Sequence, residues 1–170
     1  MQRFTTLRAG SPGYRIGRLY RANTALMSRQ LKKLPVSWGQ VPLLMEILNQ
    51  EGRTQEELSR QVRIDPACTA RALAALEKEG LVTRKENPAC RRDKQVFATP
   101  KAEDLLERLL PAMREHTDLL LKGFSPEETR QALDYFDRML ANMEQALEDG
   151  GPCADQHCAA APCAGKGDGR

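Results

Sequence analysis

Two closely spaced helix-start signals in the middle of the chain constrain its fold more than any other feature. Thr54 is followed three residues later by Glu57. This is the spacing of a capping box, in which each side chain bonds the backbone N–H of the other residue. Asp65 directly precedes Pro66, which gives an N-cap followed by proline at the first helical position. The sequence therefore predicts two short helices joined by a turn of three or four residues.

A pattern typical of a β-hairpin follows these helices. The first helix is expected over residues 55–61 and the second over residues 66–79. Apolar and polar residues then alternate over 81–85 and again over 94–98, with a polar, basic turn between them. Two short helices followed by such a hairpin are typical of a winged helix-turn-helix domain.

Amphipathic helices are expected on both sides of this domain. Apolar residues recur every three or four positions over 12–33, 101–121 and 126–149. Ser125 and Glu128 give the last of these helices a second capping box. The residues expected to be buried are Leu58, Leu73 and Leu76 in the two short helices, Ala102, Leu105 and Leu109 in the helix over 101–121, and Ala132, Leu133, Phe136, Leu140, Met143 and Leu147 in the last helix. A further helix is expected over 38–50, with Pro42 at its fifth position. The predicted fold class is mainly α with a small β-hairpin wing. The expected segments are an N-terminal dimerisation helix (1–36), the winged helix-turn-helix domain (37–100), C-terminal dimerisation helices (101–149) and a disordered, cysteine-containing tail (150–170).

The charge of the chain is unevenly distributed. Its 170 residues carry a net charge of only +3. Residues 1–45 contain eight lysines and arginines and no acid, whereas residues 104–149 contain eleven acidic and five basic residues. A basic front and an acidic back make a polarised molecule.

Several classes of protein are excluded by what the sequence lacks. No apolar run is long enough to span a membrane, and the N-terminus has no apolar signal-peptide core. We therefore expect a cytoplasmic protein. The chain has only two histidines and no Ser/His/Asp or paired-histidine pattern, so we expect neither an enzyme nor a cofactor.

The ordered set of motifs resembles the MarR family of bacterial transcription regulators. The resemblance covers about residues 12–149. The resemblance rests on these sequence motifs: Gly39-Gln40-Val41-Pro42-Leu43-Leu44, Thr54-Gln55-Glu56-Glu57-Leu58, Ile64 to Leu73, Leu76 to Val82, and Arg91-Arg92-Asp93-Lys94 with Val96 and Thr99-Pro100-Lys101. The sequence departs from the family in the wing, where Asn87 and Cys90 stand in place of two acids.

The resemblance implies a homodimer that binds double-stranded DNA and acts as a regulator, with repression expected. Each recognition helix would enter a major groove, and the operator would be a pseudo-palindrome. Side chains at the start of the second short helix are expected to face outward to the bases, and the wing to reach the minor groove and phosphates. The expected DNA contacts are Thr54, Ala67, Cys68, Thr69, Arg71, Arg84, Lys85, Arg91, Arg92 and Lys94.

The resemblance also implies a cleft for a small-molecule effector, between the dimerisation helices and the winged domain. Its expected lining is Tyr20, Arg21, Trp38 and Leu43, although residues of these types are more often core residues than ligand contacts. Release from DNA is expected through such a ligand or through thiol chemistry.

Two alternatives remain open at this stage. One is a winged-helix module that binds another protein instead of DNA. The other is a redox- or metal-responsive regulator that acts through Cys68, Cys90 or the tail. The tail holds four residues that are weak candidates as metal ligands because they match no strong zinc template: Cys153, His157, Cys158 and Cys163.

Overall fold

The computed structural model describes residues 8, 10–88 and 90–149, with the side chains of 90–92 left aside. The chain divides into two units, residues 1–113 and 114–170, which are described separately below. The expected segment boundaries remain a prediction.

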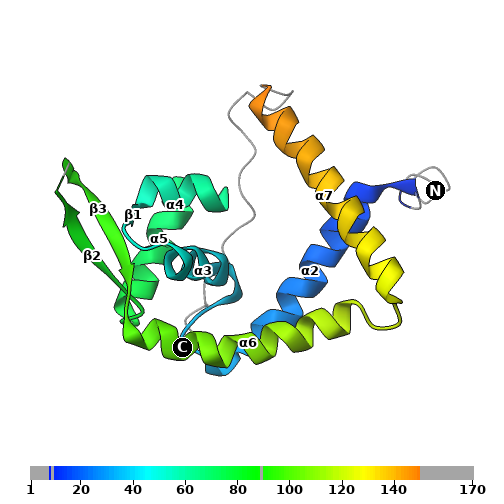
Figure 1. Ribbon diagram of the computed structural model, residues 1–170, viewed down its shortest axis with the longest axis horizontal. Helices are drawn as coiled ribbons and strands as arrows, with labels where there is room; N and C mark the ends of the chain where they lie inside the picture. Colours follow the sequence, from blue (N-terminus) through cyan, green and yellow to red (C-terminus); the bar gives the residue numbers. More distant parts are fainter. Residues whose placement is uncertain (1–7, 9, 89, 150–170) are drawn as a thin grey trace, which may run out of the picture. The chain divides into compact units, whose positions relative to one another are not determined.

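The first unit contains most of the secondary structure (Figure 1). Its elements run in the order α2 (Pro12–Gln30), η1 (Leu31–Lys33), η2 (Trp38–Gln40), α3 (Val41–Asn49), β1 (Arg53–Thr54), α4 (Gln55–Val62), α5 (Pro66–Lys78), β2 (Val82–Asn87), β3 (Cys90–Ala98) and α6 (Pro100–Leu120). The last of these continues into the second unit, which also holds α7 (Pro126–Glu148). The mainly α fold with a small β wing is confirmed.

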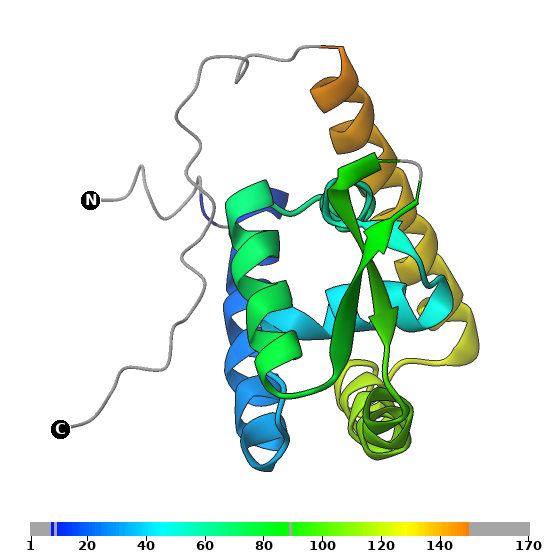
Figure 2. The ribbon, with the colours of Figure 1, turned by 90° about the vertical axis from the view of Figure 1, so that its left-hand side faces the viewer.

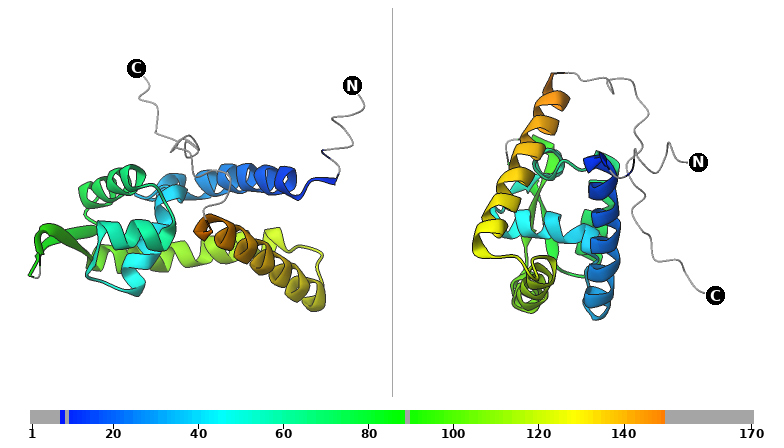
Figure 3. Two further views of the ribbon diagram at one scale, coloured as in Figure 1. Left: turned by 90° about the horizontal axis from the view of Figure 1, so that it is seen from above. Right: turned by 90° about the vertical axis from the view of Figure 1, so that its right-hand side faces the viewer.

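The wing is an antiparallel hairpin with a third strand along one edge. The sheet order is β1-β3-β2, with Arg53 paired to Val96 and Val82 paired to Ala98. The strands run further toward the turn than the alternation predicted, because cross-strand pairing continues to Asn87 and Cys90. Figure 2 shows α5 beside the hairpin, and in Figure 3 (left) the hairpin extends past α4 and α5.

Two details of the fold differ from the sequence prediction. The helix expected over 38–50 is a 3₁₀ turn, η2, followed by α3, so Pro42 lies in the first turn of α3, where a missing N–H costs no helical hydrogen bond. Strand β1 was not predicted, since two residues are too short to show an alternating pattern.

One apolar core holds the winged domain together. It joins the end of α2 to α3, α4, α5, the hairpin and the first half of α6. Leu58, Leu73 and Leu76 lie in it as predicted, and so do Ala102, Leu105 and Leu109 of α6. The other large side chains that are fully buried include Met27, Leu43, Leu44, Ile47, Leu81, Val82 and Val96. The packing of these residues fixes α5 and the wing on a common base.

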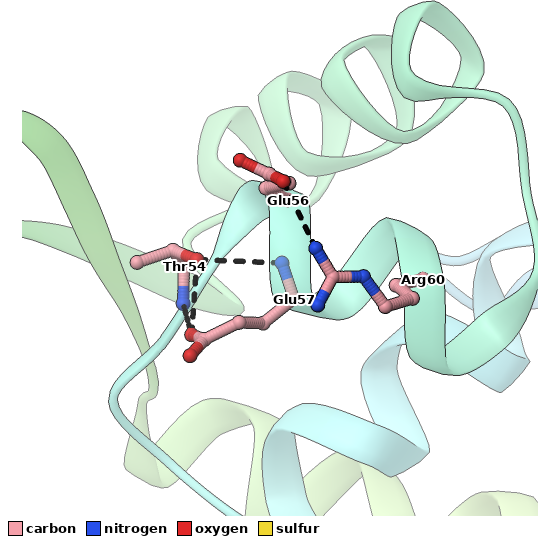
Figure 4. Close-up of polar contacts among 4 residues, drawn as sticks. All are labelled: Thr54, Glu56, Glu57 and Arg60. Atoms are coloured by element: carbon pink, nitrogen blue, oxygen red, sulfur yellow. Dashed lines mark hydrogen bonds and ion pairs between the residues drawn. The ribbon is translucent and has the colours of Figure 1, made fainter.

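The N-terminus of α4 carries the predicted capping box (Figure 4). Thr54 donates its backbone N–H to Oε2 of Glu57 at 2.7 Å, and the N–H of Glu57 reaches the Thr54 hydroxyl at 3.3 Å. The backbone hydrogen bond from Thr54, with a second one from its hydroxyl, lowers the pKa of Glu57 below its ordinary value of 4.5. Glu56 and Arg60 form a separate ion pair one helical turn apart on the exposed surface.

The second unit presents apolar side chains that its own helix cannot cover. Ser125 and Glu128 form the predicted capping box at the start of α7. None of the α7 residues that were expected to be buried is buried within one chain. The exposed fractions are 55% for Leu133, 46% for Phe136, 56% for Leu140, 63% for Met143 and 65% for Leu147.

We predict that the capping box makes stability depend on pH. Because the pKa of Glu57 is lowered in the folded state, its ionised form stabilises the fold above pH 4.5, and this contribution is lost as the pH falls below that value. Glu57→Gln should therefore lower the free energy of unfolding at pH 7, and the deficit should shrink toward pH 3. Urea denaturation over this range measures the effect. In a Thr54→Ala background the pH-dependent part should shrink but persist, because the hydroxyl is lost while the backbone N–H of residue 54 still donates to the Glu57 carboxylate. A deficit that stays constant with pH would contradict the assignment.

Candidate nucleic-acid interface

The turn between α4 and α5 sets the direction of α5. Arg63 ends α4 in the left-handed conformation, with φ of 53°. The buried Ser59 hydroxyl donates to the carbonyl oxygen of Ile64 at 2.6 Å, and the N–H of Ile64 returns a bond to the Ser59 carbonyl at 3.1 Å. These two bonds satisfy backbone groups at the end of α4 that would otherwise have no helical partner.

The first turn of α5 is fixed by Asp65. Its carboxylate accepts the N–H of Ala67 at 2.9 Å and the N–H of Cys68 at 3.0 Å. The Thr69 hydroxyl donates back to the Asp65 carbonyl at 3.1 Å. The chain therefore enters α5 in a single, fully bonded geometry.

The expectation that Cys68 and Thr69 face outward is wrong. Thr69 is completely buried and Cys68 is 8% exposed. The Thr69 hydroxyl is used for the hydrogen bond to the Asp65 carbonyl, and the Cys68 sulfur lies beside the Arg71 guanidinium. In the structure described here, neither side chain presents a group to a DNA base.

The exposed side of α5 carries small side chains and Arg71 in its first turns, and Glu77 and Lys78 in its last turn. The exposed positions at helical spacing are Ala67, Arg71, Ala74 and Lys78. The Arg71 guanidinium also reaches back along the helix, where Nη2 lies 2.9 Å from Sγ of Cys68. Alanine side chains let a helix approach closely, and they are suited to contact with thymine methyl groups.

The basic residues of the wing differ in how they are engaged. Lys85 and Lys94 are exposed, and the Lys85 ammonium lies 4.5 Å from the centre of the Phe97 ring. Arg84 is half-buried and pairs with Glu77 of α5 at 3.3 Å. Arg91 and Arg92 lie on β3, but their side chains are outside the described part of the chain.

Thr54, a predicted DNA contact, is already engaged within the protein, and Glu77 has a partner that was not predicted. The Thr54 hydroxyl already contacts the Glu57 carboxylate at 2.9 Å, which makes its surroundings anionic. Glu77 was not singled out, although its charge and its distance of seven residues from Arg84 across Gly80 were visible. Only the hairpin geometry shows that the two side chains meet.

A cavity of about 310 Å³ lies between α4, α5 and the wing. It is lined by apolar residues at its base and by both signs of charge around them. The lining is Thr54, Gln55, Glu56, Leu73, Arg84, Asp93, Lys94 and Val96.

The residues expected to line an effector cleft have different environments. Leu43 is completely buried in the core, so its assignment to an open cleft is wrong. Trp38 is half-buried against the same core. Tyr20 is 58% exposed and Arg21 is also exposed, both on α2.

Two kinds of site are not found in the part of the chain that the structure describes. Its helices include none that could cross a bilayer. Its histidines, cysteines and acids form no group of three or more that could hold a metal ion. The tail residues Cys153, His157, Cys158 and Cys163 lie outside the described residues, so the prediction of weak metal ligands there is untested.

Comparison with known proteins identifies relatives of this fold. Residues 36–94 match the MarR family. The chain is 27% identical over 133 residues to YybA, an uncharacterised HTH-type transcriptional regulator of Bacillus subtilis. The match covers 78% of this chain and 89% of YybA.

Solved structures give the same result over a longer stretch. A MarR transcriptional regulator from Methanosarcina mazei is 29% identical, with a TM-score of 0.73, over 78% of this chain and 96% of its own. A MarR family regulator from Listeria monocytogenes, solved in complex with 26mer DNA, is 26% identical with a TM-score of 0.73, over 86% of this chain and 99% of its own. Members of this family are transcription regulators and not enzymes. Residues 36–94 of the chain thus match the MarR family, and most of the chain is similar to MarR regulators of known structure.

Proposed function

We propose that this protein is a DNA-binding transcription regulator whose helix α5 reads the major groove. The observation that carries the proposal is the outward face of α5. It offers small alanine side chains and Arg71, and the helix has no acidic residue from Pro66 to Leu76. Acidic side chains at these positions would repel the phosphates of a DNA duplex. The relative solved with 26mer DNA supports the same reading.

The set of DNA contacts that we propose is smaller than the set predicted from the sequence. Ala67 and Arg71 face the bases, and Lys85 and Lys94 face phosphates. Arg91 and Arg92 remain the proposed minor-groove residues, since an arginine is favoured where the groove is narrow. Cys68 and Thr69 are left out of this set because they are buried.

We propose that the active form is a homodimer. The apolar residues of α7 recur at alternating spacings of three and four, from Leu133 through Phe136, Leu140 and Met143 to Leu147. This is the spacing of a helix that packs along another helix. Because these side chains are exposed in one chain, burial against a second copy would remove them from water. Two copies would present two α5 helices to a pseudo-palindromic operator.

Regulation is proposed as repression that a small ligand or thiol chemistry relieves. The cavity beside α5 has about 310 Å³, which is at the lower end of the volumes of small-molecule sites. The thiol of Cys68 contacts Arg71, so an adduct on this sulfur would displace a proposed DNA contact. The thiol route would act directly on the outward face of α5, whereas a ligand in the cavity would contact the inner residue Leu73 and the wing.

Removing Arg71 tests the proposed interface. We expect Arg71→Ala to weaken binding to a selected duplex by about 1–3 kcal/mol. The matched control is Arg130→Ala, which removes an exposed arginine from α7, outside the proposed interface. Dissociation constants are measured for both variants by fluorescence anisotropy over a range of salt concentrations.

The salt dependence separates the possible results. For the unmodified protein, the logarithm of the association constant should fall steeply with the logarithm of salt, with a slope of about 0.9 per phosphate contact. A wild-type protein with no salt-dependent DNA binding would favour the protein-binding alternative. An unchanged dissociation constant for Arg71→Ala would remove this residue from the interface.

The dimer is tested at the apolar stripe of α7. Leu140→Asp places a charge in the stripe and should yield a species at the 19.0 kDa mass of one chain, whereas the wild-type protein should sediment at twice that mass. Asn142→Asp introduces the same charge on another face of α7 and should leave the dimer intact. Sedimentation velocity at several concentrations provides the measurement, and a wild-type protein that stays monomeric throughout would refute the dimer.

A further inference from the structure

One ion pair joins the recognition helix to the wing. Glu77 lies in the last turn of α5, and Arg84 lies in the middle of β2. Oε2 of Glu77 is 3.3 Å from Nε of Arg84. The side chains are 45% and 23% exposed, respectively, so this pair is more shielded from solvent than the Arg60–Glu56 pair of α4, whose side chains are 76% and 82% exposed.

The strand register directs Arg84 toward the helices. Val82 and Arg84 lie two residues apart on β2 and therefore on the same face, and Val82 is 1% exposed in the core. Arg84 is paired across the hairpin with Val96, which is as buried as Val82. The arginine thus lies where the apolar core gives way to the cavity under the wing.

Glu77 lies within ion-pair distance of Arg84, and the acids Glu56 and Asp93 line the same cavity. Nε of Arg84 is buried, and it has no hydrogen-bond partner among the described residues. A shielded positive charge without a counter-charge is unfavourable, and the side chain would then move toward water. Because Arg84 is part of β2, that movement would loosen the wing from α5.

The ion pair lies at a point on the hairpin where it can affect the position of the projecting end. The base of the wing is held by the core and by bonds from Thr99 to the carbonyls of Gly80 and Leu81. Beyond Arg84 toward the turn, β2 and β3 continue through the cross-strand pairs Glu86–Lys94 and Asn87–Cys90. The ion pair therefore lies between the fixed base and the projecting end.

We propose that Glu77 is a positioning residue that holds the wing at a fixed angle to α5 through Arg84. It acts on DNA affinity without contacting DNA, and this part of the inference rests on the proposed function. Arg84, which the sequence assigned to phosphate contact, then serves mainly as the wing's attachment to the helix.

The test compares Glu77→Gln with a control and a rescue. Glu79→Gln makes the same charge change two residues away, at an exposed position. The rescue exchanges the two charges in one protein, Glu77→Arg with Arg84→Glu. Two quantities are measured for each protein: amide hydrogen exchange in the uncomplexed protein, and the dissociation constant for a selected duplex as a function of salt.

The proposal predicts a local effect. Glu77→Gln should raise exchange in β2 and β3 about two- to fivefold, which corresponds to the usual contribution of a partly exposed ion pair, and should leave exchange in α3 unchanged. Its dissociation constant should rise by a similar factor with the same salt slope. Glu79→Gln should behave like the wild type, and the exchanged pair should restore both quantities.

Two results would overturn the proposal. Unchanged exchange in the wing of Glu77→Gln would show that the ion pair does not hold it. Tighter binding with a steeper salt slope would show that Arg84 is a phosphate contact that Glu77 restrains. If the wild-type protein bound no duplex at all, the proposed function would fail, while the exchange measurement would still decide whether Glu77 positions the wing.

Discussion

The direction of α5 depends on a few hydrogen bonds in the turn that precedes it. Ser59 and Asp65 fix the two ends of this turn, through bonds to Ile64 and to the first N–H groups of α5. The core then holds Leu73 and Leu76 against α3 and the hairpin. Because the inner face of α5 is fully used in this way, the outer face is determined too. A helix that rotated about its axis would expose leucines and bury Arg71, at a cost of several kcal/mol.

Short-range signals in the sequence predicted the helices and the class of fold. Capping boxes and N-cap prolines act over three or four residues, so Thr54, Asp65 and Ser125 marked helix starts correctly. Features that depend on distant partners were missed or misplaced. Strand β1 exists only because β3 lies beside it. Thr69 was predicted to contact DNA because the helical spacing does not show the preceding turn. In the structure the Thr69 hydroxyl donates to a carbonyl group of that turn. Likewise, the Glu77–Arg84 pair depends on how the hairpin folds back onto α5.

The structure also sorts the basic residues by what they already contact. Arg53 binds Glu46 at 2.8 Å and Gln50 at 2.6 Å, which ties β1 to α3. Lys101 donates to the carbonyl of Glu79 at 2.6 Å and caps the end of α5. These cations hold the winged domain together, whereas Lys85 and Lys94 lie exposed on the wing. A net charge of +3 therefore says little about the interface. The proposed attraction to DNA comes from the few cations that are displayed on one face.

The proposed function requires that α5 and the wing recognise a specific DNA sequence. Selection of binding sites from a pool of random duplexes tests it most directly, because the experiment assumes neither an operator nor a ligand. We expect enrichment of a pseudo-palindrome whose half-sites are about one helical turn apart. A pool that stays random after repeated rounds, at a salt concentration where the protein is folded, would show that the protein does not recognise a DNA sequence.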